Sequence, residues 1–391
     1  MTQRQRRALW TAVHRYLGLA AMLFLFVAAV TGCLLCFHKP LDAALNADLF
    51  RHGGGANAIT PLAAVTAFQA GRSDLLVTSF PLSVSDGSNI PVAVAARSAG
   101  TALGFDQIFL DGRDGHVVGT RRTVSGWDRR HIMHGVFEFH FTLVAGKWGR
   151  WLMGTAALGW LIGNLVGVYL TWPLRRPWLQ NWKRMWRFSF ASVRARFMLD
   201  LHRSSGLWLL IGVSVLAFTS VTMNFFDEAF TPAVNAVSPA RPSPFDEAPR
   251  FPQHHVPHQG FSEMVDRAVA RAAADRLDWK PAMASYVPDY GLFGVSFTAS
   301  GVENYSRLGP ITYFIGAPDG QIAYVDNPYI DSAGRKLTRV LYPLHSGEVG
   351  GVATIALVFL LGLATAEMCV TGFYVYLKKR RPRRAGRRSA T

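Results

Sequence analysis

Cysteine is scarce in this chain of 391 residues, which contains only three. All three lie inside apolar segments, at Cys33, Cys36 and Cys369. An outer domain built on disulfide bonds is therefore excluded. Cys33 and Cys36 would share one face of a helix, which permits a redox pair, but packing as small buried hydrophobic residues is the simpler interpretation.

Nucleotide-binding motifs are also missing. The sequence has no G-x-G-x-x-G after a strand pattern and no G-x-x-x-x-G-K-[ST], which are the glycine-rich loops that cradle dinucleotides and ATP. The chain therefore encodes neither a dinucleotide-binding fold nor an ATP-driven motor. Any electron donor would be a separate protein, a quinol or a soluble reduced carrier.

Acidic residues are almost absent from three parts of the chain. The N-terminal tail through Arg15, the segment 175–203 and the tail after Leu377 hold 20 of the 41 basic residues, and only Asp200 opposes them. The positive-inside rule then places both termini and the middle loop in the cytoplasm and the two long intervening segments outside. The net charge of +16 thus reflects topology. Membrane lipid is the expected partner of these basic segments, and nucleic acid is not.

Long apolar runs, by contrast, occur four times. Each holds roughly the 20 residues that an α-helix needs to cross a hydrocarbon layer ~30 Å thick. The first run is much longer than the apolar core of a signal peptide, and no clear cleavage site follows it, so we interpret it as a retained anchor. The runs cover residues 8–37, 151–172, 207–226 and 352–377.

The second half of the chain repeats the first. The motif His-Arg-x-x-Gly-Leu begins at His14 and recurs 188 positions later at His202. The segment from His140 to Trp172 recurs 205 positions later, from His345 onward. Each half therefore contains two spans, one introduced by the motif and one by a lone histidine. Other matched positions are Thr31 with Thr219, Gly167 with Gly372 and Tyr169 with Tyr374.

The two long outer segments combine helix and strand patterns. Thr60-Pro61 marks the start of a helix, and strand patterns on both sides of 111–115 predict a hairpin. In the second half, a proline-rich linker precedes a helix pattern over 261–277, and a second hairpin is centred on Asp319-Gly320. That dipeptide lies 205 positions after Asp114-Gly115 of the first hairpin. Each outer segment is therefore expected to form a small α+β domain.

The segment after the second span carries Trp178, Trp182 and Trp186 among basic residues. This spacing predicts an amphipathic helix lying in the cytoplasmic interface, and a haem or partner surface is the alternative.

The chain is expected to divide into eight parts. These are a cytoplasmic tail with helix one (1–39), outer domain one (40–130), an entrance with helix two (131–174), the interfacial segment (175–201), helix three (202–226), a linker with outer domain two (227–343), helix four (344–377) and a basic tail (378–391).

Four histidines are repeated at the ends of the spans, where ionisable side chains are costly and usually functional. His14 and His202 begin the spans that start inside. His140 and His345 precede the spans that start outside. Two imidazoles facing each other across a helical bundle are the axial ligands that a b-type haem requires, and such ligation favours electron transfer. The alternative is that all four are interfacial residues hydrogen-bonded to backbone or lipid.

Neighbouring residues suit the haem interpretation. The glycines one turn after the first pair, Gly18 and Gly206, would let a flat macrocycle approach the backbone closely. Repeated arginines could neutralise the haem propionates, and these are Arg15, Arg203, Arg130 and Arg335.

Two further histidines fall outside the symmetric set. The repeat places Lys336 and Arg339 at the positions of His131 and His134. These two histidines could support a haem ligand, serve as an alternative ligand or face the substrate, and an ordinary surface role is equally open.

Three more polar features also stay open. The cluster at 254, 255 and 258 could capture a metal or form a solvated loop. Glu367 and Asn164, inside spans, suit either a proton or quinol role or hydrogen bonding to a neighbouring helix.

These motifs resemble the PepSY-associated transmembrane helix family over nearly the whole chain. The similar stretches are His-Arg-x-x-Gly-Leu, Thr31-Gly32, Phe139-His140, Gly146-Lys147-Trp148-Gly149-Arg150, 167–173 and Leu344-His345-Ser346-Gly347-Glu348. The resemblance implies that the outer domains are PepSY-like and that the four repeated histidines are the motif histidines. Phe139 stands where leucine is usual, and the histidines at 131 and 134 match no motif.

The family includes iron-regulated inner-membrane proteins of Gram-negative bacteria, some of them ferric-siderophore reductases that hold haem. We therefore expect an all-α four-helix transmembrane bundle of two tandem repeats with two periplasmic α+β PepSY-like domains. The expected function is an inner-membrane reductase with two b haems that passes electrons from the cytoplasmic side to a ferric siderophore. The alternatives are a non-enzymatic PepSY binding or regulatory protein and a metal or siderophore permease.

Overall fold

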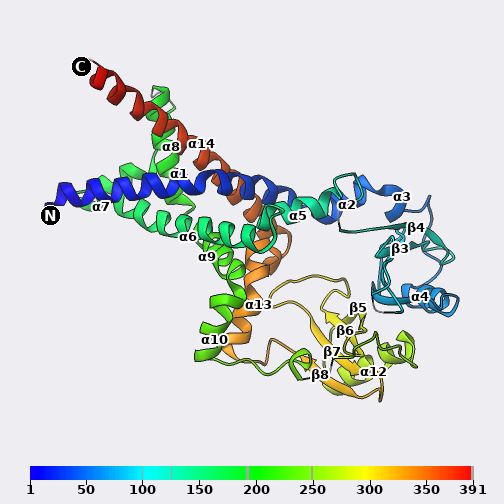
Figure 1. Cartoon of the computed structure of the whole chain (residues 1–391). Coiled ribbons are helices and arrows are strands. Elements are labelled where there is room, and N and C mark those ends of the chain that lie inside the picture. The colour runs from blue at the N-terminus through cyan, green and yellow to red at the C-terminus, as the bar shows by residue number, and fades with distance from the viewer. Residues whose placement is uncertain (99, 125, 191–192, 248–249, 389–391) are drawn as a thin grey trace. The chain divides into compact units, whose positions relative to one another are not determined.

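The computed structural model describes residues 1–98, 100–124, 126–190, 193–247 and 250–388. The chain forms two compact units (Figure 1). The helical unit contains Met1–Phe37, Val136–Ala233 and Leu344–Thr391, and the sheet unit contains His38–Gly135 and Val234–Pro343.

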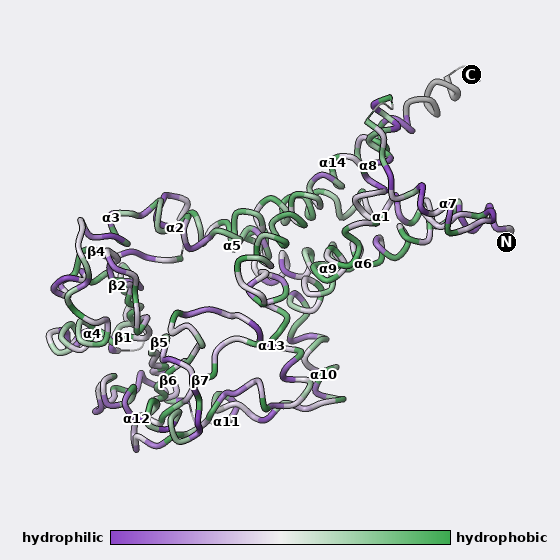
Figure 2. The backbone as a smooth tube through the Cα atoms, turned by 180° about the vertical axis from the view of Figure 1, so that it is seen from behind, coloured by the Kyte–Doolittle hydropathy of each residue, from purple (hydrophilic) through white to green (hydrophobic). Residues whose placement is uncertain are grey.

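Long apolar helices make up the helical unit. They are α1 (Gln3–Leu35), α6 (Gly146–Thr171), α14 (Val352–Arg388) and the pair α8 (Arg194–Trp208) and α9 (Leu210–Asn224). By length and composition three of them could cross a membrane, and the α8–α9 pair, bent by 73°, would make a fourth span. Figure 2 shows hydrophobic residues concentrated along these helices. The protein is therefore a membrane protein with three to four candidate spans.

The spans pack as a four-helix ring. Helix α1 packs against α6 and α14, α9 packs against α6, and α8 packs against α14. Helix α1 and the bent pair are thus diagonal partners, the arrangement in which bundles build cofactor sites from facing side chains. The third span was expected as one helix over 202–226. The observed helix starts at Arg194 and bends at Leu209.

Each lone repeated histidine lies on a short helix of its own. His140 is on α5 (Ile132–Thr142), and His345 is on α13 (Ala333–Ser346). Left-handed residues separate these helices from the spans that follow. They are Leu143 and Val144 before α6, and Gly347, which precedes the short η3 (Glu348–Gly350), before α14.

The tryptophan-rich segment after α6 is only partly the expected amphipathic helix. Helix α7 (Trp178–Lys183) is followed by the 3-10 turn η1 (Arg184–Trp186). Its Trp182 ring meets Trp172 at a tilt, with 5.0 Å between centroids. Trp182 then meets Trp186 edge to face at 5.3 Å, and Trp186 meets Trp208 of α8 edge to face at 5.1 Å.

The sheet unit is built on one eight-stranded antiparallel sheet with the order β4-β3-β2-β1-β5-β6-β7-β8. The strands are β1 (Leu75–Pro81), β2 (Ile90–Ala96), β3 (Gln107–Leu110), β4 (Val117–Arg121), β5 (Lys280–Val287), β6 (Leu292–Thr298), β7 (Ile311–Gly316) and β8 (Ile322–Asp326). Both expected hairpins are confirmed as β3–β4 and β7–β8.

Each repeat also contributes one helix to the core of this unit. Helix α4 (Pro61–Ala70) begins with Thr60, whose hydroxyl accepts from the Ala63 N–H, so the expected helix start is confirmed. Helix α12 (Phe261–Ala274) buries Phe261, Met264, Val265, Ala268 and Ala272, the face that its period of 3.6 predicts. Short helices complete the chain at α2 (His38–Leu45), α3 (Ala47–Phe50), η2 (Phe226–Phe230), α10 (Thr231–Val237) and α11 (Pro244–Glu247), the last two within the expected linker.

The two expected outer domains share a single sheet. Strand β1 pairs with β5, matching Ser79 with Ser285, Phe80 with Ala284 and Pro81 with Met283. Since β5 begins 205 positions after β1, the same edge of both repeats forms this contact about a pseudo-twofold axis. Pairing removes two open sheet edges, which would otherwise bind other strands.

Candidate functional site: two histidine pairs

The first histidine pair joins the diagonal helices of the bundle. His14 extends from α1 and His202 from α8, and their ring centroids lie 6.4 Å apart with an angle of 70° between the ring planes. Both side chains are partly buried. The structure therefore brings together two residues that the sequence pairs across 188 positions.

The second pair repeats this arrangement with His140 and His345. Their ring centroids lie 6.1 Å apart, with an angle of 58° between the planes. On α1, the residue that hydrogen-bonds His140 is Thr31, which lies 17 residues after His14. At 1.5 Å per residue, about 25 Å of helix separates the two pairs.

Backbone carbonyls fix the rings of the first pair. Nδ1 of His14 lies 3.1 Å from the Gly163 carbonyl oxygen, and Nδ1 of His202 lies 3.0 Å from the Met368 carbonyl oxygen. Gly163 and Met368 are themselves equivalent in the 205-residue repeat. Because a carbonyl can only accept, Nδ1 carries the proton, and Nε2 keeps the lone pair that a metal needs.

Threonine hydroxyls take this role in the second pair. Thr31 and Thr219 each place Oγ1 2.9 Å from Nδ1 of His140 and His345, respectively. Each hydroxyl donates its own proton to a carbonyl one turn back, of Val27 at 2.7 Å and Val215 at 2.9 Å. Oγ1 is then left to accept from the imidazole, so Nε2 keeps its lone pair here too.

The sequence matched these threonines but assigned them no function. Matched glycines were missed in the same way. A Cβ on Gly372 would lie 3.1 Å from Cε1 of His202, and one on Gly167 would lie 3.5 Å from Cε1 of His14. These glycines let each imidazole approach the facing helix closely.

Desolvation keeps the second pair neutral. On α5 and α13, which precede the spanning helices, burial lowers the pKa of His140 and of His345 to about 4. A hydrogen bond with the Ala28 carbonyl raises the pKa of His140 and so partly opposes burial. The neighbouring His140 lowers the pKa of His345 further. Both imidazoles are therefore neutral at pH 7, which is the form that binds metal ions.

The ring separations can be compared with those of a doubly ligated iron. A metal–imidazole bond of about 2 Å, plus roughly 1.1 Å from Nε2 to the ring centre on each side, places two axial imidazoles about 6 Å apart. The observed 6.4 and 6.1 Å agree with this value. Both pairs thus fit one bis-histidine haem each.

The glycines and arginines expected around haem are placed unequally. Nothing lies within 4 Å of a Cβ built on Gly18, whereas one on Gly206 would lie 3.7 Å from the Met368 sulfur. Arg203 donates to the Met185 carbonyl and to Asp200, and Arg15 lies over the ring of Tyr16. These four residues all belong to the helical unit.

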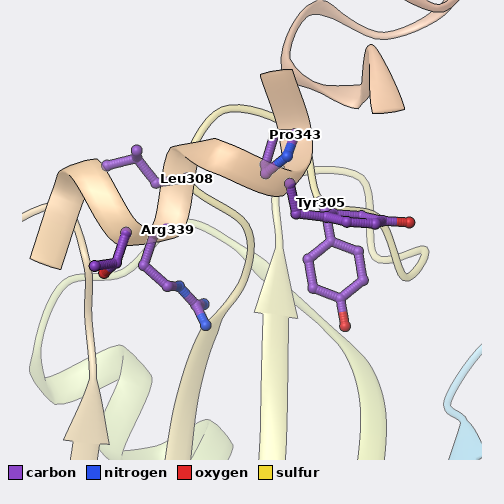
Figure 3. A pocket seen from close by; sticks show the side chains of 6 residues that line it. Tyr305, Leu308, Arg339 and Pro343 are labelled. Atoms are coloured by element: carbon purple, nitrogen blue, oxygen red, sulfur yellow. The ribbon is translucent and has the colours of Figure 1, made fainter. Parts of the chain in front are cut away.

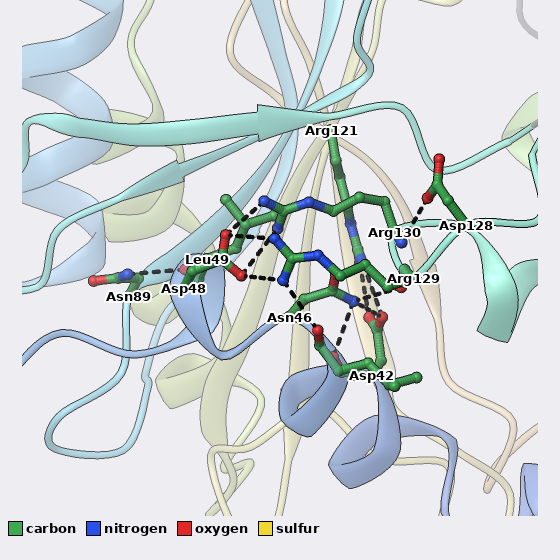
Figure 4. A network of polar contacts seen from close by, with 10 residues as sticks. Asp42, Asn46, Asp48, Leu49, Asn89, Arg121, Asp128, Arg129 and Arg130 are labelled. Carbon is green, nitrogen blue, oxygen red and sulfur yellow. Dashed lines mark hydrogen bonds and ion pairs between the residues drawn. The ribbon is translucent and has the colours of Figure 1, made fainter.

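The other two arginines lie in ion pairs of the sheet unit. Arg130 contacts Asp48 at 2.6 Å, within the polar network of Figure 4 that also joins Arg129 to Asp48. Arg335 contacts Asp326 at 3.2 Å. The structure therefore gives both arginines carboxylate partners within that unit.

The other histidines that the sequence singled out belong to the sheet unit, and three of them have partners of their own. Nδ1 of His131 lies 2.8 Å from Asp128, and both His131 and His134 belong to the sheet unit. His254 contacts the Ala96 carbonyl oxygen at 2.8 Å, and His255 contacts the Tyr286 hydroxyl at 2.8 Å. Within the described ranges, the one group with metal-binding spacing is Asp111, Asp114 and His116.

The two polar residues inside spans differ in their surroundings. Asn164 of α6 donates to the Ser214 hydroxyl of α9 at 3.2 Å, as expected for a helix-to-helix hydrogen bond. Glu367 of α14 is hydrogen-bonded to Ser205 of α8, while its Oε1 is buried without a partner among the described residues.

A pocket of about 360 Å³ lies in the sheet unit, beside α13. Figure 3 shows Arg339 and Tyr305 on the side of the helix that also carries Pro343. The Tyr305 and Tyr342 rings meet edge to face at 5.4 Å. In the first repeat, His134, Phe137 and Glu138 take the positions of Arg339, Tyr342 and Pro343, so this set of side chains belongs to the second repeat alone.

The helices, the repeated histidines and the duplicated sheet define a membrane protein with an attached α+β unit. The family model described as PepSY-associated TM region matches residues 11–379, and the chain therefore belongs to that family. No curated protein matches the chain.

Proposed function

We propose that this protein is a di-haem b reductase of the bacterial inner membrane that transfers electrons from the cytoplasmic side to a periplasmic ferric siderophore. Reduction to Fe(II) loosens the chelate and releases iron for uptake. The observation that carries the proposal is the pair of facing imidazoles at each end of the bundle, separated by 6.4 and 6.1 Å.

Haem held by two imidazoles would supply one-electron transfer. The chain's own contribution is to hold the ligands. His14 and His202 would hold one haem, and His140 and His345 the other. The carbonyl and threonine acceptors keep Nδ1 protonated and Nε2 available.

The direction of transfer follows from topology. The basic residues at the termini and in 175–203 favour a cytoplasmic position for the first pair. The second pair would then lie near the periplasmic face, where the chain enters the sheet unit through α5 and α13. The donor would be a quinol or a cytoplasmic reduced carrier.

The pocket beside α13 supports the assignment of a chelate as substrate. It combines two tyrosine rings with the Arg339 guanidinium, which also contacts Asp326 at 3.6 Å and donates to the Pro310 carbonyl. This lining suits an anionic or aromatic ligand. Pro343 of the pocket precedes His345 by two residues on α13. We therefore place the ferric chelate at this pocket.

A visible absorption spectrum tests the function directly. The detergent-purified protein should show a Soret band that shifts on dithionite reduction, and a pyridine haemochrome assay should give two haems per chain. Loss of one haem is expected in His202→Ala and in His345→Ala. Absence of the Soret band would contradict the reductase proposal. Transport assays in vesicles without reductant would then distinguish a permease from a binding protein.

A further inference from the structure

We infer that the hydrogen-bond acceptors behind the two histidine pairs bias a transferred electron toward the His140/His345 pair. The inference rests on the proposed function, since it concerns haem held by these imidazoles. Carbonyl oxygens accept from Nδ1 in the first pair, at Gly163 and Met368, and threonine hydroxyls accept in the second pair. The second repeat carries this difference alone, whereas in the first repeat the Ala28 carbonyl also faces His140 beside Thr31.

The two kinds of acceptor differ in strength. A peptide carbonyl is the negative end of a dipole of about 3.5 D and has no proton to give away. His202 even has a second acceptor, Oγ1 of Thr371 at 3.2 Å. The first pair therefore polarises its Nδ1–H bonds more strongly than the second.

Polarisation at Nδ1 is transmitted to Nε2 through the ring. A stronger acceptor makes the imidazole a more basic ligand, which stabilises the more positive, oxidised iron and lowers its reduction potential. The first pair should therefore hold the haem of lower potential, and the second pair the haem of higher potential. An electron entering at the first pair would then move toward the second without an external driving force.

Of the two threonines, Thr219 gives the cleaner test. The Ala28 carbonyl also faces His140 beside Thr31. Thr219 is 1% exposed and bonds to His345 at 2.9 Å. Thr222, one turn later on α9, provides a matched control, because it is also buried and its hydroxyl bonds to the carbonyls of Phe218 and Thr219 in its own helix.

The first measurement compares potentials in the full-length protein. Spectroelectrochemical titration of His202→Ala reports the haem of the second pair, and titration of His345→Ala reports the haem of the first pair. The haem left in His202→Ala should have the higher potential. Equal potentials, or the reverse order, would overturn the inference while leaving the proposed function intact, because both variants would still show haem.

The second measurement removes the acceptor. Thr219→Val keeps the shape of the side chain, so the higher potential should rise further. We expect at least a tenfold increase in the ratio of reduced to oxidised haem at fixed ambient potential, which corresponds to about 59 mV. Thr219→Ser and Thr222→Val should leave both potentials unchanged. A shift of the lower potential, or no shift in Thr219→Val, would contradict the inference. If Thr219→Val binds one haem only, the order of the haem potentials in His202→Ala and His345→Ala decides whether the inference holds.

Discussion

The two histidine pairs reach nearly the same ring separation with different supports. The first pair extends from α1 and from α8, which belong to the candidate spans, and glycines on neighbouring helices lie against its rings. The second pair lies on the short helices α5 and α13, each of which ends in a left-handed turn. Packing between spans therefore fixes one site, and the junctions between short and long helices fix the other.

This difference separates the effects of substitutions at the two sites. A change at the glycines facing His14 and His202 should disturb the first site alone. A change in the turns after α5 and α13 should disturb the second site alone. Loss of a whole ligand should separate the two sites most strongly.

Removing one ligand from each pair should block electron transfer at different steps. In His345→Ala, a quinol or dithionite should still reduce the remaining haem, but a ferric chelate added afterwards should not reoxidise it. In His202→Ala, the chelate should reoxidise the remaining haem after chemical reduction. Stopped-flow absorption measures both reactions.

His131→Ala is the control, because this histidine bonds to Asp128 outside both pairs. It should retain both haems and both reactions. If His345→Ala reacted with the chelate as the wild type does, the second pair would not be the exit site.

Substitution of the ring-facing glycines should produce a smaller loss, confined to the first pair. A Cβ on Gly372 would lie 3.1 Å from the His202 ring, closer than nearly all real contacts, whereas one on Gly167 would make an ordinary contact at 3.5 Å. Overpacking costs about 1–3 kcal/mol. Gly372→Ala should therefore weaken haem binding at the first pair roughly tenfold, and Gly167→Ala much less.

Haem transfer to apomyoglobin measures these affinities. Gly159→Ala is the matched control on α6, since its Cβ would meet only the Leu17 side chain, at 4.0 Å. Equal haem loss in all three variants would show that the glycines do not set the ring position.

The histidines could be found from sequence because duplication matched them at fixed shifts. The same signal did not reveal what lies opposite each residue. Thr31 and Thr219 were matched without a role, because helical periodicity defines a face and not the partner of that face. Arg130 and Arg335 were matched too, yet the structure pairs them with Asp48 and Asp326 in the sheet unit.

The fold shows the same limit. Local patterns predicted the hairpins and the starts of α4 and α12, since turn and capping residues act within a few positions. The pairing of β1 with β5 could not be predicted, because the two strands are about 200 residues apart in sequence and the backbone of an open sheet edge can pair with any strand. The bend at Leu209 falls inside a sequence that reads as continuously helical.

The pocket beside α13 should affect substrate binding more than turnover. Arg339→Gln removes a charged donor, and a hydrogen bond to a charged group contributes about 1.5–3 kcal/mol. We expect KM for an anionic ferric tris-catecholate to rise roughly tenfold, with kcat nearly unchanged and haem content intact. A steady-state assay of Fe(II) release provides both constants.

His134→Gln is the matched control, because His134 holds the same position in the first repeat. A neutral ferric hydroxamate should respond less to Arg339→Gln than the catecholate does. If His134→Gln raised KM more than Arg339→Gln, the chelate would bind in the first repeat and the pocket assignment would be wrong.

The smallest expected effect concerns the turn between α5 and α6. Val144 is 55% exposed and adopts a φ of 58°, where a β-branched residue is strained by roughly 1–2 kcal/mol. Val144→Gly removes this strain but increases the entropy of the unfolded chain, which offsets about 0.5–1 kcal/mol of the gain. The net result should be a slight rise in the thermal midpoint for loss of the second haem, which is measured through the Soret absorbance.

Val349→Gly, at the equivalent position in η3, is the control. It should lower this midpoint, because the backbone of Val349 is not left-handed and the substitution relieves no strain. Equal shifts in both variants would mean that the turn does not support the second pair as the geometry implies.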